Sequence, residues 1–202
     1  MNSLVLEKAK EFIKQEFANE VTGHDWYHID RVYKMATQLQ SKEGGNLKII
    51  QLAALFHDFT DKKLKEYPEE AERQMIAWLR ENNLSEMEIE MISNVIKNIS
   101  YSNESSHSHN LSLETKIVQD ADRLDAIGAI GIARCFTYGG SEGRQIYNPE
   151  NKEATSVQHF FDKLLNIKGI IQTDSAKEVA GMRHCILISF LKELENECNI
   201  QF

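Results

Sequence analysis

The sequence contains little cysteine, and the pattern of its cysteines excludes a disulfide framework. Its 202 residues include three cysteines, an odd number, and no two of them form a CxxC pair. Disulfide scaffolds and thiolate metal sites both use paired cysteines at regular spacings, so we expect neither. The sequence favours a reducing compartment instead, and we expect a cytoplasmic protein.

Long hydrophobic runs are also missing from the chain. No apolar stretch approaches the roughly 20 residues that a helix needs to cross a bilayer. The N-terminal residues MNSLVLEK lack the basic region and the apolar core of a signal peptide. We therefore expect no membrane partner and no export.

Positive charge is in deficit. Lysine and arginine number 23 against 31 aspartate and glutamate residues, which gives a net charge of −8. Non-specific binding to a nucleic-acid polymer depends on basic residues that release counterions, so it is not expected. A small anionic substrate would need a local positive charge, most simply a bound cation.

Proline occurs only twice, and no segment alternates apolar and polar residues over the length of a strand. Apolar residues recur at intervals of three and four, the period of an amphipathic helix. With 42% hydrophobic residues and no repeat or linker, the chain fits one domain over residues 1–202. We predict an all-α helical bundle, with helices at about 5–17, 29–39, 47–58, 68–79, 86–99, 113–124, 157–165 and 175–194 and a polar loop at about 141–153.

Three helix starts carry capping signals. Ser85 precedes Glu88 by three residues, and Ser175 precedes Glu178 in the same way, the spacing of a capping box. Asp25 is placed to act as the N-cap of the second helix. These signals predict that helices begin directly after Ser85, Ser175 and Asp25.

Two strong metal ligands, His57 and Asp58, adjoin at the end of an apolar run. A helix turns about 100° per residue, so neighbouring side chains converge on one ion only near a helix end. His28 and Asp122 also fall on apolar helix faces, where a polar group is costly unless it is paired or bound to metal. One divalent cation would satisfy all four residues, and this mixed nitrogen and oxygen set suits a hard-to-borderline ion.

The order and spacing of these four residues resemble those of a known family. His28, the pair His57-Asp58 and Asp122 follow one another at spacings of 29 and 64 residues, within the phrases GHDWYH, AALFHDFTD and IVQDADRLDAIGAIGIAR. These phrases resemble the HD-domain superfamily of metal-dependent phosphohydrolases, in particular a bacterial subgroup that includes nucleotide pyrophosphohydrolases. The resemblance implies a helical bundle with the metal site in its core.

The resemblance also implies a cofactor and a substrate. We expect one divalent ion, with Mn²⁺ favoured and Mg²⁺, Ni²⁺, Co²⁺ and Fe²⁺ as further candidates. The expected substrate is a phosphorylated small molecule, above all a nucleoside triphosphate that is cut to a monophosphate and pyrophosphate. A 5′-nucleotidase, a phosphodiesterase and a non-catalytic regulatory module that binds metal or nucleotide stay open as alternatives. The sequence does not indicate the oligomeric state.

Asp61 is the candidate catalytic residue, because several HD-domain hydrolases carry an acid three positions after the metal-binding aspartate. There it would orient or deprotonate the attacking water. The alternative is an ordinary solvated acid. Lys63 is the expected phosphate contact, since the subgroup carries a lysine two positions after that acid.

Three further residues are candidates for substrate binding. Arg31 follows His28 by one turn and would hold either the substrate or a carboxylate. Arg123 adjoins Asp122 and would hold a phosphate oxygen, or pair with Asp120 or Asp125. His24 lies in the loop before the second helix, where a residue beside a rigid ligand often carries function.

His107 and His109 form a separate histidine pair in a polar segment. They would supply a second metal ion or cover the substrate, or they are exposed loop residues. The binuclear branch of the superfamily arranges its histidines differently, so we expect one metal ion.

Overall fold

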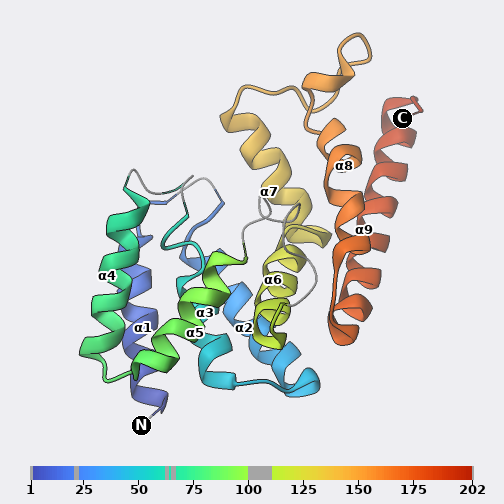
Figure 1. The fold of residues 1–202 in the computed structure, drawn as a ribbon. Helices are drawn as coiled ribbons and strands as arrows, with labels where there is room; N and C mark the ends of the chain where they lie inside the picture. The colour runs from blue at the N-terminus through green and yellow to red at the C-terminus, as the bar shows by residue number, and fades with distance from the viewer. Residues whose placement is uncertain (1, 21–22, 62–63, 65–66, 100–110, 202) are drawn as a thin grey trace. The chain divides into compact units, whose positions relative to one another are not determined.

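The computed structural model describes residues 2–20, 23–61, 64, 67–99 and 111–201 (Figure 1). The chain forms two compact units, Met1–Ala121 and Asp122–Phe202. A single domain over residues 1–202 stays a prediction, and each unit is described by itself. Along the chain the elements are α1 (Asn2–Glu16), α2 (Trp26–Glu43), α3 (Leu47–Phe56), α4 (Pro68–Glu81), α5 (Glu86–Lys97), α6 (Leu113–Asp125), α7 (Gly128–Ser141), the 3₁₀ helix η2 (Lys152–Ala154), α8 (Gln158–Asp162), the 3₁₀ helix η3 (Leu164–Ile170) and α9 (Asp174–Cys198).

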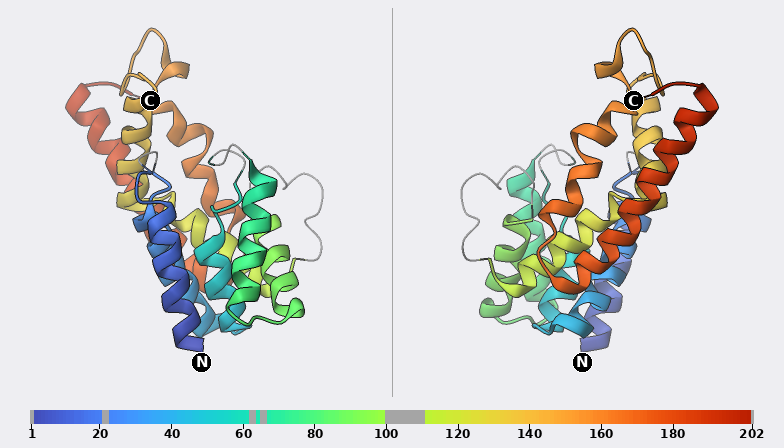
Figure 2. Two further views of the ribbon diagram at one scale, coloured as in Figure 1. Left: turned by 90° about the vertical axis from the view of Figure 1, so that its left-hand side faces the viewer. Right: turned by 90° about the vertical axis from the view of Figure 1, so that its right-hand side faces the viewer.

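The first unit is built around α3, whose residues 49–56 are all buried. Helices α1, α2 and α5 each pack against α3, and α4 packs against α5. Figure 2 shows these helices grouped in one unit. A helix that is apolar on every side is stable only when neighbours cover every side. The site pair His57-Asp58 therefore follows the most enclosed helix of this unit.

An aromatic cluster holds the turn that follows α3. The ring of Phe56 lies 5.2 Å from that of Trp78, and the ring of Phe59 lies 5.5 Å from that of Phe12. Phe56 and Phe59 are fully buried, and they flank His57 and Asp58 in the sequence. Burial of two large rings anchors the backbone on both sides of this pair.

The second unit consists of the end of α6, α7, α8, η2, η3 and α9. Helix α7 packs against α9, and η3 packs against both α8 and α9. Phe136 of α7, Phe160 of α8 and Phe190 of α9 form its aromatic centre, with ring centroids 5.7 to 5.8 Å apart. Three helices thus share one apolar cluster.

The prediction of an all-α protein is confirmed. Among the described residues the only extended pairing is an isolated bridge between Gln145 and Thr155. Asp25 is the N-cap of α2, and Ser85 and Glu88 form the predicted capping box of α5. None of the helices in the described part of the chain is long and apolar enough to span a membrane.

Several predicted boundaries were wrong. Helix α3 ends at Phe56, two residues before the predicted end at about residue 58. The next backbone N–H groups, those of Phe59 and Asp61, donate to carbonyl oxygens only three residues earlier, at Phe56 and Asp58. The segment predicted as one helix at 157–165 is divided at Lys163, whose φ of −134° is not helical. The predicted loop at 141–153 contains the end of α7 and the start of η2.

In the C-terminal half of the chain, one predicted helix cap was wrong and one helix was not predicted. The N-cap of α9 is Thr173, and Ser175 lies inside the helix and is buried, so the predicted cap at Ser175 is wrong. Helix α7 was not predicted, because its glycines at 128, 131, 139 and 140 are unfavourable in a helix interior. At Gly131 a Cβ would lie 2.3 Å from the Ala126 carbonyl oxygen, so close packing requires glycine there.

Candidate metal centre

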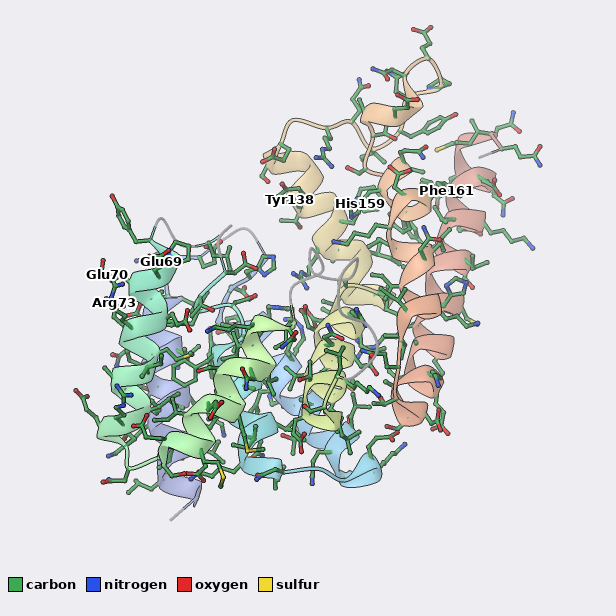
Figure 3. The ribbon with its side chains drawn as sticks, viewed as in Figure 1. Glu69, Glu70, Arg73, Tyr138, His159 and Phe161 are labelled. Carbon is green, nitrogen blue, oxygen red and sulfur yellow. The ribbon has the colours of Figure 1, made fainter. Side chains whose placement is uncertain are left out.

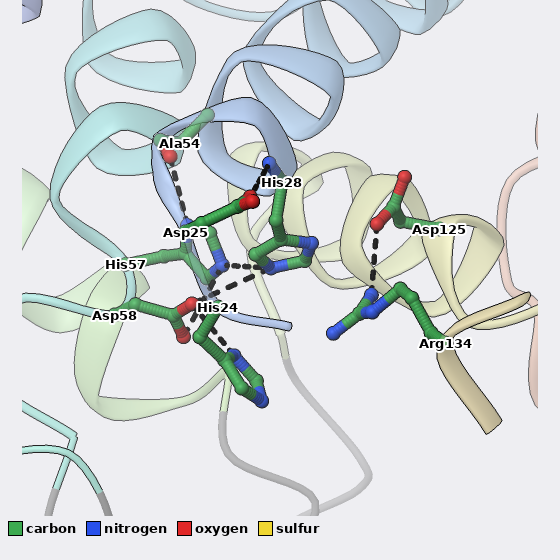
Figure 4. Close-up of polar contacts among 8 residues, drawn as sticks. All are labelled: His24, Asp25, His28, Ala54, His57, Asp58, Asp125 and Arg134. Atoms are coloured by element: carbon green, nitrogen blue, oxygen red, sulfur yellow. Dashed lines mark hydrogen bonds and ion pairs between the residues drawn. The ribbon is translucent and has the colours of Figure 1, made fainter. Parts of the chain in front are cut away.

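His57 lies at the C-cap of α3, and its ring is fixed by the backbone of the same helix. Its Nδ1 lies 2.8 Å from the carbonyl oxygen of Ala54 (Figure 4). A carbonyl oxygen only accepts hydrogen bonds, so Nδ1 carries the proton. In the neutral ring, Nε2 then presents a lone pair to its surroundings. A backbone partner of this kind is typical of histidines that bind metal through the other nitrogen.

His28 lies in the first turn of α2, and its ring approaches that of His57. Its backbone N–H donates to Oδ1 of Asp25 at 2.8 Å, which holds the start of the helix and therefore the histidine. The His28 side chain is fully buried. Its Nε2 lies 3.2 Å from Nε2 of His57. Two segments 29 residues apart in sequence thus bring two ring nitrogens together.

The pair of histidines fits a bound cation. Two nitrogens each about 2.1 Å from one ion lie about 3.0 Å apart at a right angle and about 3.4 Å apart at a tetrahedral angle. The observed separation of 3.2 Å falls in this range. Two facing lone pairs repel each other unless a proton or a metal ion lies between them. The arrangement of His28 and His57 is therefore that of two ligands directed at one position.

Asp58 supplies negative charge beside both rings. One of its carboxylate oxygens lies 3.3 Å from Nε2 of His57 and the other 3.4 Å from Nε2 of His28. Burial raises the pKa of Asp58, but the electrostatic interaction with His57 and the contacts with His24 and His28 outweigh it and hold the pKa well below its usual range. Asp58 is therefore ionised at neutral pH and is chemically suited to a cation.

His24 joins this cluster from the loop before α2. Its Nδ1 lies 2.9 Å from Oδ2 of Asp58, and its ring meets that of His28 edge-on at 5.2 Å. His24, His28 and Asp58 each offer a ligand atom within 4.8 Å of the others. Sequence reasoning placed His24 at the substrate, and its contact with Asp58 was missed. The second His-Asp dipeptide, His24-Asp25, was the available signal.

Asp122 lies half-buried on α6, immediately after the end of the first unit. Because Asp122 belongs to the second unit, its ligation of the ion stays a prediction. Asp61 is half-buried in the turn after α3, and its N–H donates to the Asp58 carbonyl at 3.2 Å. Asp61 therefore follows Asp58 by a single tight turn, and its catalytic role stays a prediction.

The predicted substrate contacts have different outcomes. Arg123 donates a hydrogen bond of 2.9 Å to the backbone oxygen of Ile170, a structural link that the sequence did not predict. Arg31 is half-buried on α2, and its role at the substrate stays a prediction. Lys63, His107 and His109 lie outside the described residues.

A partly buried ion pair in the second unit was also missed. Nη1 of Arg134 lies 2.8 Å from Oδ2 of Asp125, which is 4% exposed (Figure 4). This pair joins the last residue of α6 to α7. The sequence suggested Asp125 only as a partner of Arg123, two residues away, because helical spacing does not reveal contacts across a helix junction.

Comparison with known proteins identifies the family. The HD domain family matches residues 25–127. YpgQ of Bacillus subtilis is 35% identical over 192 residues, which cover 95% of this chain and 92% of YpgQ. A crystal structure of YpgQ in complex with ADP matches 95% of this chain and 97% of its own, with 32% identity and a TM-score of 0.82.

Two further crystal structures match at higher identity. The Lin1889 protein of Listeria innocua is 42% identical with a TM-score of 0.85, covering 100% of this chain and 99% of its own. An HD-superfamily hydrolase of Bacillus thuringiensis is 41% identical with a TM-score of 0.85 and full coverage of both chains. With its histidine and aspartate cluster and these relatives, the chain belongs to the HD-domain superfamily of hydrolases.

Proposed function

We propose that this protein is a divalent-metal-dependent phosphohydrolase that cleaves nucleoside triphosphates to monophosphates and pyrophosphate. The observation that carries the proposal is the convergence of His28, His57 and the ionised Asp58 on one position. The YpgQ structure in complex with ADP supports a nucleotide as the substrate, because YpgQ aligns with 95% of this chain.

His28, His57, Asp58 and Asp122 would hold the ion, and Mn²⁺ is the favoured metal because imidazoles prefer transition metals to Ca²⁺. The ion would polarise a phosphoryl oxygen and lower the pKa of water at the site. Water attacks the α-phosphorus, and the bond from this phosphorus to the α–β bridging oxygen breaks. One monophosphate and one pyrophosphate leave.

The protein's own groups would orient and accept protons. Asp61 would take a proton from the attacking water, since it follows the ligand Asp58 by one tight turn. His24 would hold the Asp58 carboxylate through their 2.9 Å contact. Lys63, Arg31 and Arg123 would contact the phosphates, where each added positive charge counters the chain's net charge of −8.

The experiment is a screen of nucleotides and phosphate esters against Mn²⁺, Mg²⁺, Co²⁺, Ni²⁺ and Ca²⁺ after removal of bound metal with a chelator. Products are assigned by ³¹P NMR. We expect pyrophosphate from triphosphates, with more activity in Mn²⁺ than in Ca²⁺. Orthophosphate alone from monophosphates would identify a 5′-nucleotidase instead. Full activity in excess chelator, or no turnover with any metal, would refute the proposal.

Matched variants test the site directly. His57→Ala and Asp58→Ala should lose bound metal and activity together, because each removes a ligand. His184→Ala is the control, since His184 lies on α9 in the second unit. Metal content by mass spectrometry and circular dichroism of each variant separate loss of metal from loss of fold.

A further inference from the structure

Helix α9 carries a surface stripe on the side opposite its packed face. The packed face includes the buried residues Ala176, Ala180, Leu187 and Leu191. The opposite side, which we call the α9 stripe, consists of Glu178, Gly181, Met182, Cys185, Ile188, Ser189 and Lys192. All of these residues are exposed except Gly181, which is half-buried. In the right-hand view of Figure 2, α9 lies in front of the other elements of the second unit, and in Figure 3 its outer side chains project away from α7 and α8.

The middle of the α9 stripe is apolar. Met182 is 64% exposed and Ile188 is 46% exposed, and the exposed Cys185 lies between them. Single exposed apolar residues are ordinary on a protein surface. These three recur at intervals of three along one face of a helix, so their side chains form one continuous patch. A second apolar face on a helix that is already packed on its other side is typical of a helix with a further partner.

The α9 stripe is symmetric about Cys185. Met182 and Ile188 lie three positions on either side of it, and Gly181 and Ser189 lie four positions on either side. When a second copy of the helix runs antiparallel, with a two-fold axis beside Cys185, each residue faces the other member of its pair. Met182 then faces Ile188 of the second copy, and Gly181 faces Ser189. Apolar side chains meet each other, and small residues let the two backbones approach closely.

Gly181 supports this close approach. A Cβ at Gly181 would meet no atom of the described residues within 4 Å, so packing inside the chain does not require a glycine there. Glycine in a helix interior is less stable than alanine, because it loses more backbone entropy on folding. A second backbone that passes over this position accounts for the glycine.

The charges at the two ends of the α9 stripe complement each other in the same arrangement. Glu178 and Lys192 lie seven positions from its centre, and Lys177 and Glu193 lie eight positions from it. The two-fold axis places each acid opposite a lysine of the second copy. A parallel pair would instead set Glu178 against Glu178 and Lys192 against Lys192. Lys177 also lies 2.8 Å from Asp174 in its own helix, but exposed side chains exchange partners readily, so opposite signs at matching positions suffice.

We propose that the α9 stripe is the interface of a homodimer in which two copies of α9 pack antiparallel about Cys185. The occupant is a second copy of this chain, because the stripe matches itself in polarity, size and charge at each paired position. The contact spans about four turns of each helix, which is small for an interface, so the dimer should dissociate on dilution. The stripe lies wholly within the second unit, and the dimer does not depend on the proposed function.

Analytical ultracentrifugation of the full-length protein over a range of concentrations measures the dimer. We expect a reversible equilibrium between monomer and dimer. Met182→Glu should weaken the dimer at least about tenfold, because it places a charge against an apolar residue in a contact without water. Met87→Glu is the matched control, since Met87 is 69% exposed on α5 in the first unit, and it should leave the equilibrium unchanged. Circular dichroism checks that each variant is folded.

Charge reversal tests the predicted pairing. Glu178→Lys and Lys192→Glu should each weaken the dimer, because each sets like charges opposite one another twice. The double variant should restore the dimer, since the signs are again opposite and the net charge equals that of the wild type. Glu70→Lys is the control for a change of charge alone, because Glu70 is an exposed acid in the first turn of α4 (Figure 3). A double variant as weak as the two single variants combined would overturn the proposal.

Thiol chemistry locates the two-fold axis. In the dimer the two Cys185 thiols adjoin, whereas the two Cys198 thiols lie about 39 Å apart along the helix axes. A short bismaleimide should therefore link Cys198→Ser chains through Cys185 and should not link Cys185→Ser chains. Alkylation of Cys185 should slow as the protein concentration rises and stay fast in the dilute monomer, while that of the exposed Cys198 stays constant. A protein that is monomeric at every concentration, or a dimer that Met182→Glu leaves intact, would overturn the proposal.

Discussion

Residues of the candidate metal centre are oriented by local hydrogen bonds with the backbone. The Ala54 carbonyl fixes the proton of His57 on Nδ1, and the Asp25 cap fixes the first turn that carries His28. Both partners lie within three residues of the group that they orient. Local hydrogen bonds of this kind hold ligands in place before any ion binds, which lowers the entropy cost of assembling the site.

Asp61 gives the sharpest test of catalysis at this scale. Asp61→Asn keeps the size of the side chain but cannot accept a proton, and general acid–base contributions are typically about 10² to 10⁴-fold. We expect kcat to fall in this range while metal content and KM change little. Steady-state kinetics and metal analysis of the purified variant check it. Unchanged kcat would make Asp61 a surface acid, and loss of metal would make it a ligand.

Cys135 should be an unreactive thiol. Burial raises the pKa of Cys135 to about 11, and its Sγ lies 3.4 Å from the Ser156 carbonyl. A raised pKa leaves the thiol protonated until the pH approaches that value, so alkylation at pH 8 should be at least about 100-fold slower than for a free thiol with a pKa of about 8.5. Site-resolved mass spectrometry after alkylation measures the rates, with exposed Cys185 as the internal reference. Equal rates at both sites would contradict the burial of Cys135.

At the scale of elements, helix ends position the candidate metal ligands of the first unit. His57 lies at the end of α3, and His28 lies in the first turn of α2. Helix ends leave backbone groups without helical partners, so the chain must turn there and side chains can converge from different directions. The packing of Phe59 against Phe12 and of Phe56 against Trp78 anchors the turn after α3.

Two adjacent glycines of α7 test how closely its end packs. Gly139→Ala should destabilise the fold by about 1 to 3 kcal/mol, because the new Cβ would meet the buried Ser156 side chain. Gly140→Ala has nothing within 4 Å and should stabilise by about 0.5 to 1 kcal/mol through helix propensity. Urea denaturation of both variants measures the difference. Stabilisation by both would show that α7 does not approach Ser156 so closely.

For the molecule as a whole, charge and metal binding are linked. The net charge of −8 is unfavourable for an anionic substrate, and the ionised Asp58 adds to it inside the first unit. A bound divalent cation reverses the sign of the local field where the substrate must arrive. The same ion would bind the folded chain and not the unfolded one, so it should also contribute to stability.

Thermal stability should therefore depend on the metal. For the chelator-treated protein, Mn²⁺ at about 100 times its Kd should raise the free energy of unfolding by about 2.7 kcal/mol. Differential scanning fluorimetry reports this as a higher Tm. Ca²⁺ should have a smaller effect, and His57→Ala should abolish the response to Mn²⁺. A variant that responded like the wild type would exclude His57 as a ligand.

The sequence by itself determined the helical class and most helices, because helical periodicity and capping are local properties. It also singled out His28, His57 and Asp58, which the structure brings together, while their binding of a metal ion stays a prediction. Only the tertiary structure decided which groups meet. The contact of His24 with Asp58 joins a loop to the turn after α3, and the pairing of Arg134 with Asp125 crosses a helix junction. Such contacts depend on how separate elements pack, and no spacing along the chain encodes that packing directly.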